Sequence, residues 1–476
     1  MKRGAGMRAG ALLLALSLQA CSTPPTEQGV PAPPSVPARW QALEAPGGGG
    51  ATPDGLHRWW RFFGDTALGD WTERAQQGSP RTAAATAAWH QALAQRDAAA
   101  AALAPTLAAN ASAGSDVTGQ GSSRRSSEQV QLGLEARWMP DLDGGAAHAL
   151  AAADALAQAR RASLGDVQVQ LAGEAALAYI DLRALQARRR LVRDTLASQR
   201  QTLQITAWRE QAGLASGLQR EQARAAVAQT EALLPALQAA VVQSRHTLAQ
   251  LAGQPYETVA DDDAPVPVAA DGLALDIPAG TMRQRADVRA AELEVAAALS
   301  RVGQAQSQRR ASFSLGGSIG LRALTLGALG DGASLVGGLL AGVSLPLFDS
   351  GALRAQVRGQ QAALDAARAR HRATVLAALK TVEDALVTLA GDRARALALA
   401  TAAAAATQAD ALARHRYASG LVDFQTVLET QRAAFSAQDA VDGGRADLAR
   451  SHVRLYLALG GGWEPVPHTA AVEVAP

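Results

Sequence analysis

The 476-residue sequence has few aromatic residues and only one cysteine. Aromatic residues make up 4% of the chain, although 48% of it is hydrophobic and alanine runs are frequent. This composition favours long alanine-rich helices over an aromatic core. The single cysteine, Cys21, excludes an intrachain disulfide and a thiolate metal cluster.

An excess of charge of one sign is also missing. The chain carries 45 basic and 43 acidic residues, a formal net charge of +2. Such a balance gives no electrostatic reason to expect a nucleic-acid partner. No stretch approaches the roughly 20 uninterrupted apolar residues of a membrane-spanning helix. A membrane crossing would therefore have to use strands.

Arrangements of residues that would carry catalysis or bind a metal are absent as well. The eight histidines are scattered and do not show the HExxH spacing or a comparable ligand pattern. The sequence therefore predicts no enzyme activity, no catalytic residues, no metal site and no dissociable cofactor.

The N-terminus has the form of a secretory signal. Basic residues precede an apolar run, Ala9–Leu18, that is too short to span a membrane. The run leads to Leu18-Gln19-Ala20-Cys21, which resembles the bacterial lipobox, whose cysteine becomes lipidated. We expect residues 1–20 to be a signal peptide, Cys21 to carry a covalent lipid, and residues 21–58 to form a linker rich in proline and glycine. An incidental cysteine is the alternative.

Beyond the linker the chain repeats itself at a spacing of about 207 residues. We expect a first repeat over 59–262, a second over 263–462 and a tail over 463–476. Each repeat is predicted to run helix, strand, strand, helix, helix. The correspondences include Asp143 with Asp349 and Gly213 with Gly420.

Four predicted strands alternate between apolar and polar side chains. They cover Leu107–Val117, Gln129–Trp138, Phe313–Leu321 and Leu335–Leu347, and loops over 119–127 and 327–332 close two hairpins. Such alternation is typical of a membrane β-barrel, although a soluble sandwich with one wet face has it too. Four strands cannot close a barrel, and lipid tolerates no open strand edge. A barrel would therefore be shared between copies of the chain.

Two long helices are predicted from about 145 to 212 and from 351 to 419. The second spans some 69 residues, or roughly 100 Å at 1.5 Å per residue. Uncapped helices of this length imply coiled-coil packing. Shorter helices are predicted over 66–104, 215–251, 282–311 and 421–459. Two shorter helices placed end to end match one long helix, which suggests a tube wall that mixes continuous and spliced helices.

Three segments resemble the TolC-like outer-membrane efflux factors, specifically the lipoprotein branch that serves RND-type pumps. They are Trp59–Asp65, Arg283–Glu292 and Leu345–Gly351. Ala286 replaces a proline that is usual in the second segment. The resemblance implies a mainly α, internally duplicated chain whose homotrimer forms a shared twelve-stranded membrane β-barrel, four strands per chain, and a long periplasmic α-helical barrel.

The same resemblance implies a function and a set of partners. The protein would be a passive exit duct in the outer membrane, lipid-anchored and reaching into the periplasm. It would export small molecules with a periplasmic adaptor and an inner-membrane RND-type pump. A channel for type I protein secretion and a pore-free coiled-coil lipoprotein that bridges the envelope are the alternatives. The sequence does not identify the cargo.

The two helix-to-helix turns are expected at the periplasmic tip, where the resemblance implies that the adaptor docks. The residues that match the family pattern there are Arg209, Gly213, Leu214 and Ser216 in the first turn, and Arg416, Gly420 and Leu421 in the second. Both glycines are also ordinary turn residues. The resemblance further places the periplasmic aperture at Tyr417, Asp423 and Glu429. Tyr417 and either Arg416 or Arg209 are expected to take part in the hydrogen bonds and salt links that close it. A solvated helix face is the alternative for each charge.

Overall fold

The computed structural model describes residues 40–41, 53–118, 125–256, 264–269, 278–325, 328–331 and 333–464. The chain divides into two units, Met1–Val36 and Pro37–Pro476, and all described residues belong to the second. Cys21 and most of the predicted linker lie outside the described residues. The first half of the chain contains α2 (Pro53–Leu56), η2 (Trp59–Phe63), α3 (Thr66–Gly78), α4 (Pro80–Ala101), β1 (Thr106–Thr118), β2 (Arg125–Trp138), α5 (Gly145–Gln211), α6 (Gly217–Glu231) and α7 (Leu233–Leu251). The second half contains α8 (Pro278–Gln284), α9 (Ala286–Ser307), β3 (Ser312–Ala323), α10 (Ala328–Asp331), β4 (Ser334–Ser344), α11 (Ala352–Ala418) and α12 (Phe424–Ala458).

The two predicted long helices are present as α5 and α11, each of 67 residues. Both begin after a glycine in the left-handed region, Gly144 at φ 75° and Gly351 at φ 88°. An aspartate accepts hydrogen bonds from the first amides of each helix. Asp349 does so for α11, and Asp141 does so for α5. The repeat pairs Asp349 with Asp143, so the capping aspartate of α5 lies two residues before the paired position.

Three of the four shorter helices are divided, which the sequence prediction missed. Ser79 has an extended backbone and ends α3 while it caps α4, because Pro80 restricts the residue before it. Arg285 is likewise extended and separates α8 from α9, even without the usual proline at position 286. A third break falls at Ala232, between α6 and α7.

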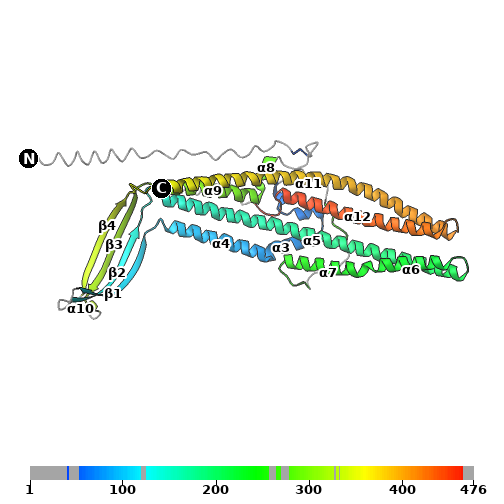
Figure 1. The fold of residues 1–476 in the computed structure, drawn as a ribbon, viewed down its shortest axis with the longest axis horizontal. Helices are drawn as coiled ribbons and strands as arrows, with labels where there is room; N and C mark the ends of the chain where they lie inside the picture. The colour runs from blue at the N-terminus through cyan, green and yellow to red at the C-terminus, as the bar shows by residue number, and fades with distance from the viewer. Residues whose placement is uncertain are drawn as a thin grey trace, which may run out of the picture. The chain divides into compact units, whose positions relative to one another are not determined.

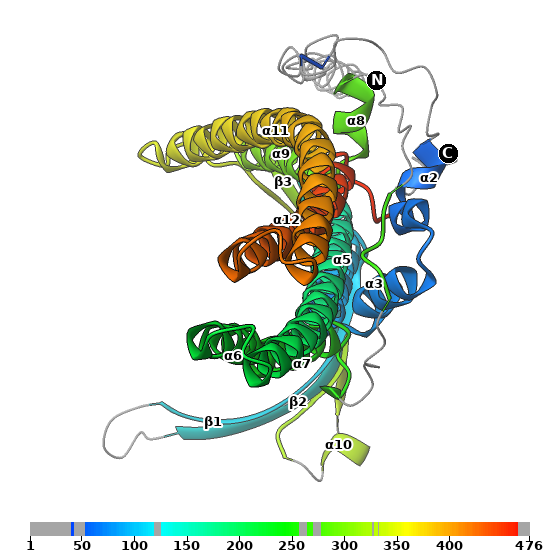
Figure 2. The same cartoon turned by 90° about the vertical axis from the view of Figure 1, so that its right-hand side faces the viewer.

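The helices pack side by side in one curved layer (Figures 1 and 2). Helices α9 and α12 lie end to end between α5 and α11, while α4 and the α6–α7 pair lie along the other side of α5. The predicted mixture of continuous and spliced helices is therefore confirmed. In Figure 2, α2, α3 and α8 lie on the convex side of this layer.

The four strands form one antiparallel sheet in the order β1-β2-β3-β4, at the opposite end of the layer from the α5–α6 and α11–α12 turns (Figure 1). Its register places the apolar positions of neighbouring strands opposite one another. Leu132 faces Leu321, and Leu134 faces Ile319. Since side chains alternate along each strand, one face of the sheet is apolar from β1 to β4. Leu134 and Ile319 are 46% and 55% exposed in the single chain.

The predicted hairpin loops differ in detail from the structure. Strand β2 begins at Arg125, so the first loop is shorter than 119–127, and residues 119–124 lie outside the described residues. The second loop contains the short helix α10. By length and composition, the stretch Gly217–Leu251 could also cross a membrane. It packs along α5 and is divided at Ala232, so we interpret it as part of the helical layer.

An aromatic cluster packs the segment that precedes α3 against the helical layer. Trp59 is fully buried and stacks on Tyr456, with ring centroids 5.4 Å apart. Asp65 accepts a hydrogen bond of 2.9 Å from the Tyr179 hydroxyl, and Arg183 donates to the same hydroxyl at 2.8 Å. Burial raises the pKa of Tyr179, so the phenol stays protonated as a donor. This gives the Trp59–Asp65 segment a structural role.

Candidate functional site at the hairpin tips

The α5–α6 and α11–α12 turns lie at the same end of the helical layer (Figure 1). Each turn closes through a glycine in the left-handed region, Gly213 at φ 71° and Gly420 at φ 74°. The amide that follows each glycine donates back to a carbonyl of the last helical turn. Leu214 donates to Arg209 at 2.7 Å, and the equivalent bond in the second turn is 2.9 Å. The two turns therefore share one backbone design.

An exposed leucine projects from each turn. Leu214 is 71% exposed and Leu421 is 73% exposed. Neither leucine side chain takes part in the hydrogen bonds that close the turn, which join backbone atoms. The pair is therefore available for contact with another molecule.

A polar side chain caps the helix that follows each turn. Ser216 and Gln219 form a reciprocal capping box at the start of α6. Asp423 accepts a hydrogen bond of 2.9 Å from the amide of Thr426 at the start of α12. Hydrogen bonds from the hydroxyl and the amide of Thr426 hold the pKa of Asp423 below its usual value. Both caps fix the direction in which the returning helix leaves the turn.

Arg209 joins the two hairpins within one chain. Its Nη1 atom donates a hydrogen bond of 3.0 Å to the carbonyl oxygen of Tyr417, and its guanidinium lies 4.6 Å from the Tyr417 ring centroid. The Tyr417 ring also packs against Phe424, with centroids 5.5 Å apart. Of the two arginines predicted to take part in closing the aperture, Arg209 contacts Tyr417, while the side chain of Arg416 is exposed.

The predicted aperture residues do not form one cluster within the chain. Glu429 lies exposed on α12, where Gln425 donates a hydrogen bond of 3.1 Å to it. Asp423 is engaged in its helix cap. Tyr417 is buried, and its hydroxyl has no hydrogen-bond partner within the described part of the chain. A buried hydroxyl usually has a partner.

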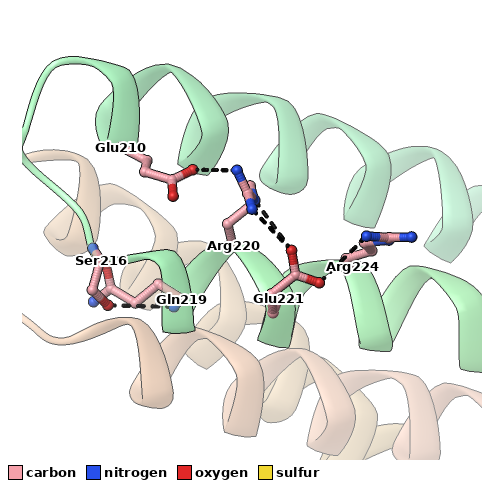
Figure 3. A network of polar contacts seen from close by, with 6 residues as sticks. All are labelled: Glu210, Ser216, Gln219, Arg220, Glu221 and Arg224. Atoms are coloured by element: carbon pink, nitrogen blue, oxygen red, sulfur yellow. Dashed lines mark hydrogen bonds and ion pairs between the residues drawn. The ribbon is translucent and has the colours of Figure 1, made fainter.

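A charged network at the first tip was missed from the sequence (Figure 3). Arg220 pairs with Glu210 across the turn at 2.9 Å and with Glu221 at 3.1 Å. Glu221 in turn pairs with Arg224 at 3.5 Å. The i,i+3 spacing of Glu221 and Arg224 could have indicated the last pair. The pair across the turn depends on how the two helices approach, which the sequence does not show.

Comparisons with known proteins agree with this architecture. The family model "Outer membrane efflux protein" matches residues 71–254 and 280–461. The pyoverdine export outer membrane protein OpmQ of Pseudomonas putida is 33% identical over 468 residues, which cover 95% of this chain and 97% of that protein. The solvent efflux pump outer membrane protein SrpC of Pseudomonas putida is 30% identical over 94% of this chain and 97% of its own length.

Among solved structures, the outer-membrane channel OprN superimposes with a TM-score of 0.83 at 32% identity. The alignment covers 91% of this chain and 98% of the OprN chain. The residues matched by the family model include the strands, both long helices and both tips. The chain therefore belongs to the outer membrane efflux protein family, and it is the outer-membrane component of an efflux system.

Proposed function

We propose that three copies of this chain form a passive duct through which small molecules leave the cell across the outer membrane. A periplasmic adaptor and an inner-membrane RND-type pump would complete the assembly and supply the energy. The observation that supports this proposal best is the open sheet with one continuous apolar face.

The sheet is incomplete in a single chain. Within the described residues, β1 and β4 each pair with one strand only, so the sheet has two open edges. In the hydrocarbon core, each unpaired backbone group costs several kcal/mol, whereas a closed barrel pairs them all. Single-chain bacterial outer-membrane barrels begin at about eight strands. Three copies would supply twelve strands and remove every edge.

The relatives support small molecules as the class of cargo. Their names assign pyoverdine to one protein and solvents to another, and both are small compounds. Related ducts that serve such different compounds share one architecture, which gives little basis for selection by the duct itself. We infer that the inner-membrane pump chooses the cargo.

The hairpin tips are the proposed docking surface for the adaptor. The exposed Leu214 and Leu421 offer apolar contacts, and the backbone turns at Gly213 and Gly420 hold them in equivalent positions. Ser216 and Arg209 support these turns, while Arg416 adds an exposed charge beside the second one.

The periplasmic aperture is proposed at Tyr417, Asp423 and Glu429. The buried Tyr417 hydroxyl supports this assignment, because its missing hydrogen-bond partner could come from a neighbouring copy of the chain. The exposed Glu429 would form an acidic ring in a trimer and favour cations. A covalent lipid on Cys21 would add a second attachment to the outer membrane, and we propose no other cofactor.

A pair of adjacent substitutions on β3 tests the duct. Ile319→Arg places a charge on the apolar face and should cost about 2–4 kcal/mol if that face meets lipid. Ser318→Arg places the same charge on the polar face. We expect S318R to form trimers with altered ion selectivity in planar bilayers, and I319R to yield few inserted channels. Normal insertion of I319R, or the absence of single-channel currents from wild-type trimers, would refute the proposal.

A further inference from the structure

A cavity of about 550 Å³ lies where α9 and α12 meet end to end between the two long helices. Helix α12 ends at Ala458, and Gly460 at φ 78° turns the chain away. Helix α9 begins at Ala286, so the two helix ends leave a recess in the layer. Arg285 ties the ends together, because it donates to the carbonyl of Ala458 and pairs with Asp287 at 2.7 Å.

The lining combines apolar and charged side chains. Val169 and Ala385 are buried, Leu457 is half-buried, and together they supply an apolar wall. A volume of this size is in the range of pockets that hold small molecules. A mixed lining of this kind suits a molecule with an apolar body and a polar or charged group.

Of the three aspartates that line the cavity, two form ion pairs. Asp287 pairs with Arg285, and Asp384 pairs with Lys380. No ion pair within the described chain includes Asp166, which accepts a hydrogen bond of 2.7 Å from Gln170. Asp166 is half-buried, so its charge is screened by water less than that of a surface group.

The remaining cation of the lining is Arg454, which is exposed. Exposed charges act weakly at a distance because water and salt screen them. The cavity therefore has a partly dehydrated negative group inside and a solvated positive group at its edge. This arrangement favours a cation over an anion.

The cavity opens toward the concave side of the helical layer. The amide of Gln41, from the segment before α2, donates to Glu383 of α11 at 2.8 Å. The α11 residues Thr381, Asp384 and Thr388, which line the cavity, lie roughly 100–160° around the helix from Glu383. On α12, Tyr456 stacks on Trp59 of η2, the segment directly before α3, and α3 lies on the convex side in Figure 2. Arg454 of the cavity lies roughly 160° around α12 from Tyr456, so the cavity belongs to the opposite side.

We propose that this cavity binds a small organic cation with an apolar body, held by the Asp166 carboxylate and by the wall of Val169, Ala385 and Leu457. In the proposed duct the concave side faces the lumen, so the cavity would hold cargo of this class during export. The inference thus rests on the proposed function for the source of the ligand. The binding itself can be measured separately.

The test uses full-length purified trimers and ethidium, a fluorescent organic cation, in a fluorescence-polarisation titration. Asp166→Asn should weaken ethidium binding tenfold or more, because it removes the charge and keeps the shape. Arg454→Gln should strengthen binding severalfold, because it removes a like charge. Asp365→Asn is the matched control, since Asp365 is an exposed α11 carboxylate that does not line the cavity. N-phenyl-1-naphthylamine, a neutral probe, should bind wild type and D166N alike.

The pH dependence gives a second measurement. Burial, and next the nearby charge of Asp287, raise the pKa of Asp166. As pH is lowered, ethidium affinity should therefore begin to fall at a higher pH than it would with an aspartate of ordinary pKa. This loss of affinity should be absent in D166N. The charged groups that face Asp166 are Asp287, Asp384, Arg285 and Arg454.

Unchanged ethidium binding by D166N would overturn the proposal. So would preferential binding of the anion 8-anilinonaphthalene-1-sulfonate that is lost in Arg454→Gln, because the cavity would then be an anion site. Planar-bilayer currents separate the two proposals. Currents through D166N channels would show that the duct survives a failed binding site, whereas binding without currents would count against the duct alone.

Discussion

The contact between Arg209 and Tyr417 should determine how firmly the two hairpins of a chain hold together at the tip. Arg209→Ala removes a hydrogen bond from a charged donor and a cation–π contact. Hydrogen bonds to charged groups contribute about 1.5–3 kcal/mol, and a cation–π contact at a partly exposed site about 0.5–1 kcal/mol. Arg209 is half-buried, so the lower ends of both ranges apply. The expected loss is about 2 kcal/mol.

A loss of about 2 kcal/mol corresponds to roughly a thirtyfold increase in the population of the opened tip. Hydrogen exchange measures that population directly when opening is local. In R209A trimers, the amides of Gly420 and Leu421 should exchange about thirtyfold faster than in wild type, because they close the second turn next to Tyr417. Amides in the middle of α11 should be unaffected.

Arg416→Ala is the matched control, because the duplication places Arg416 at the position equivalent to Arg209. Its side chain is exposed, so its removal should change exchange at the tip by less than about threefold, the effect of a surface contact. Equal exchange in R209A and wild type would refute the argument that Arg209 joins the hairpins. Equal acceleration in R209A and R416A would show that net charge at the tip, and not the contact, sets its stability.

Two further substitutions test the caps and the packing of the helical layer. The folded-state pKa of Asp423 is lowered, so its cap is fully stabilising above the ordinary aspartate pKa of about 3.9 and is lost as pH falls through the lowered value. After correction for intrinsic exchange, the Thr426 amide should therefore lose hydrogen-exchange protection below about pH 4 in wild type. Asp423→Asn should not show this loss, and identical pH profiles of protection in the two proteins would contradict the argument. Gly165→Ala should lower the melting temperature of the trimer, because the added methyl would lie 2.4 Å from the Trp463 ring, and such overpacking costs about 1–3 kcal/mol. Gly359→Ala, with nothing within 4 Å in the chain, should not lower it, and an equal drop in both variants would remove the packing argument.

Hydrophobic periodicity was sufficient to predict most of the fold. The alternation in Phe313–Leu321 and Gln129–Trp138 indicated both strands and the face that each presents, because a strand has a period of two. The sheet register then placed Leu134 opposite Ile319. Helix breaks were harder to predict. Ser79 and Arg285 adopt extended backbones inside segments whose alanine-rich sequence favours a continuous helix.

The tip was predictable where it depends on backbone and not where it depends on long-range contacts. Glycines at 213 and 420 indicated reversals, and both adopt positive φ. The assignment of these residues to adaptor docking stays a proposal. The sequence did not choose between Arg209 and Arg416 as the partner of Tyr417, because that choice depends on how two hairpins 208 residues apart approach each other. Nor did the sequence indicate the cavity between α9 and α12, because residues from several distant segments line it.

The duplication preserves the backbone of the two tips but not their side-chain contacts, and this asymmetry matters for a shared duct. At equivalent positions, Glu210 pairs with Arg220 of its own hairpin, whereas Tyr417 is held by Arg209 of the other hairpin. The first tip is therefore stabilised locally, and the second depends on its neighbour in the same chain. In the proposed trimer, hairpins within a chain would be tied through Arg209, while the buried hydroxyl of Tyr417 would be left to a group from the next chain. The six hairpins of such a duct would then be joined alternately, through Arg209 within a chain and through a group at Tyr417 between chains.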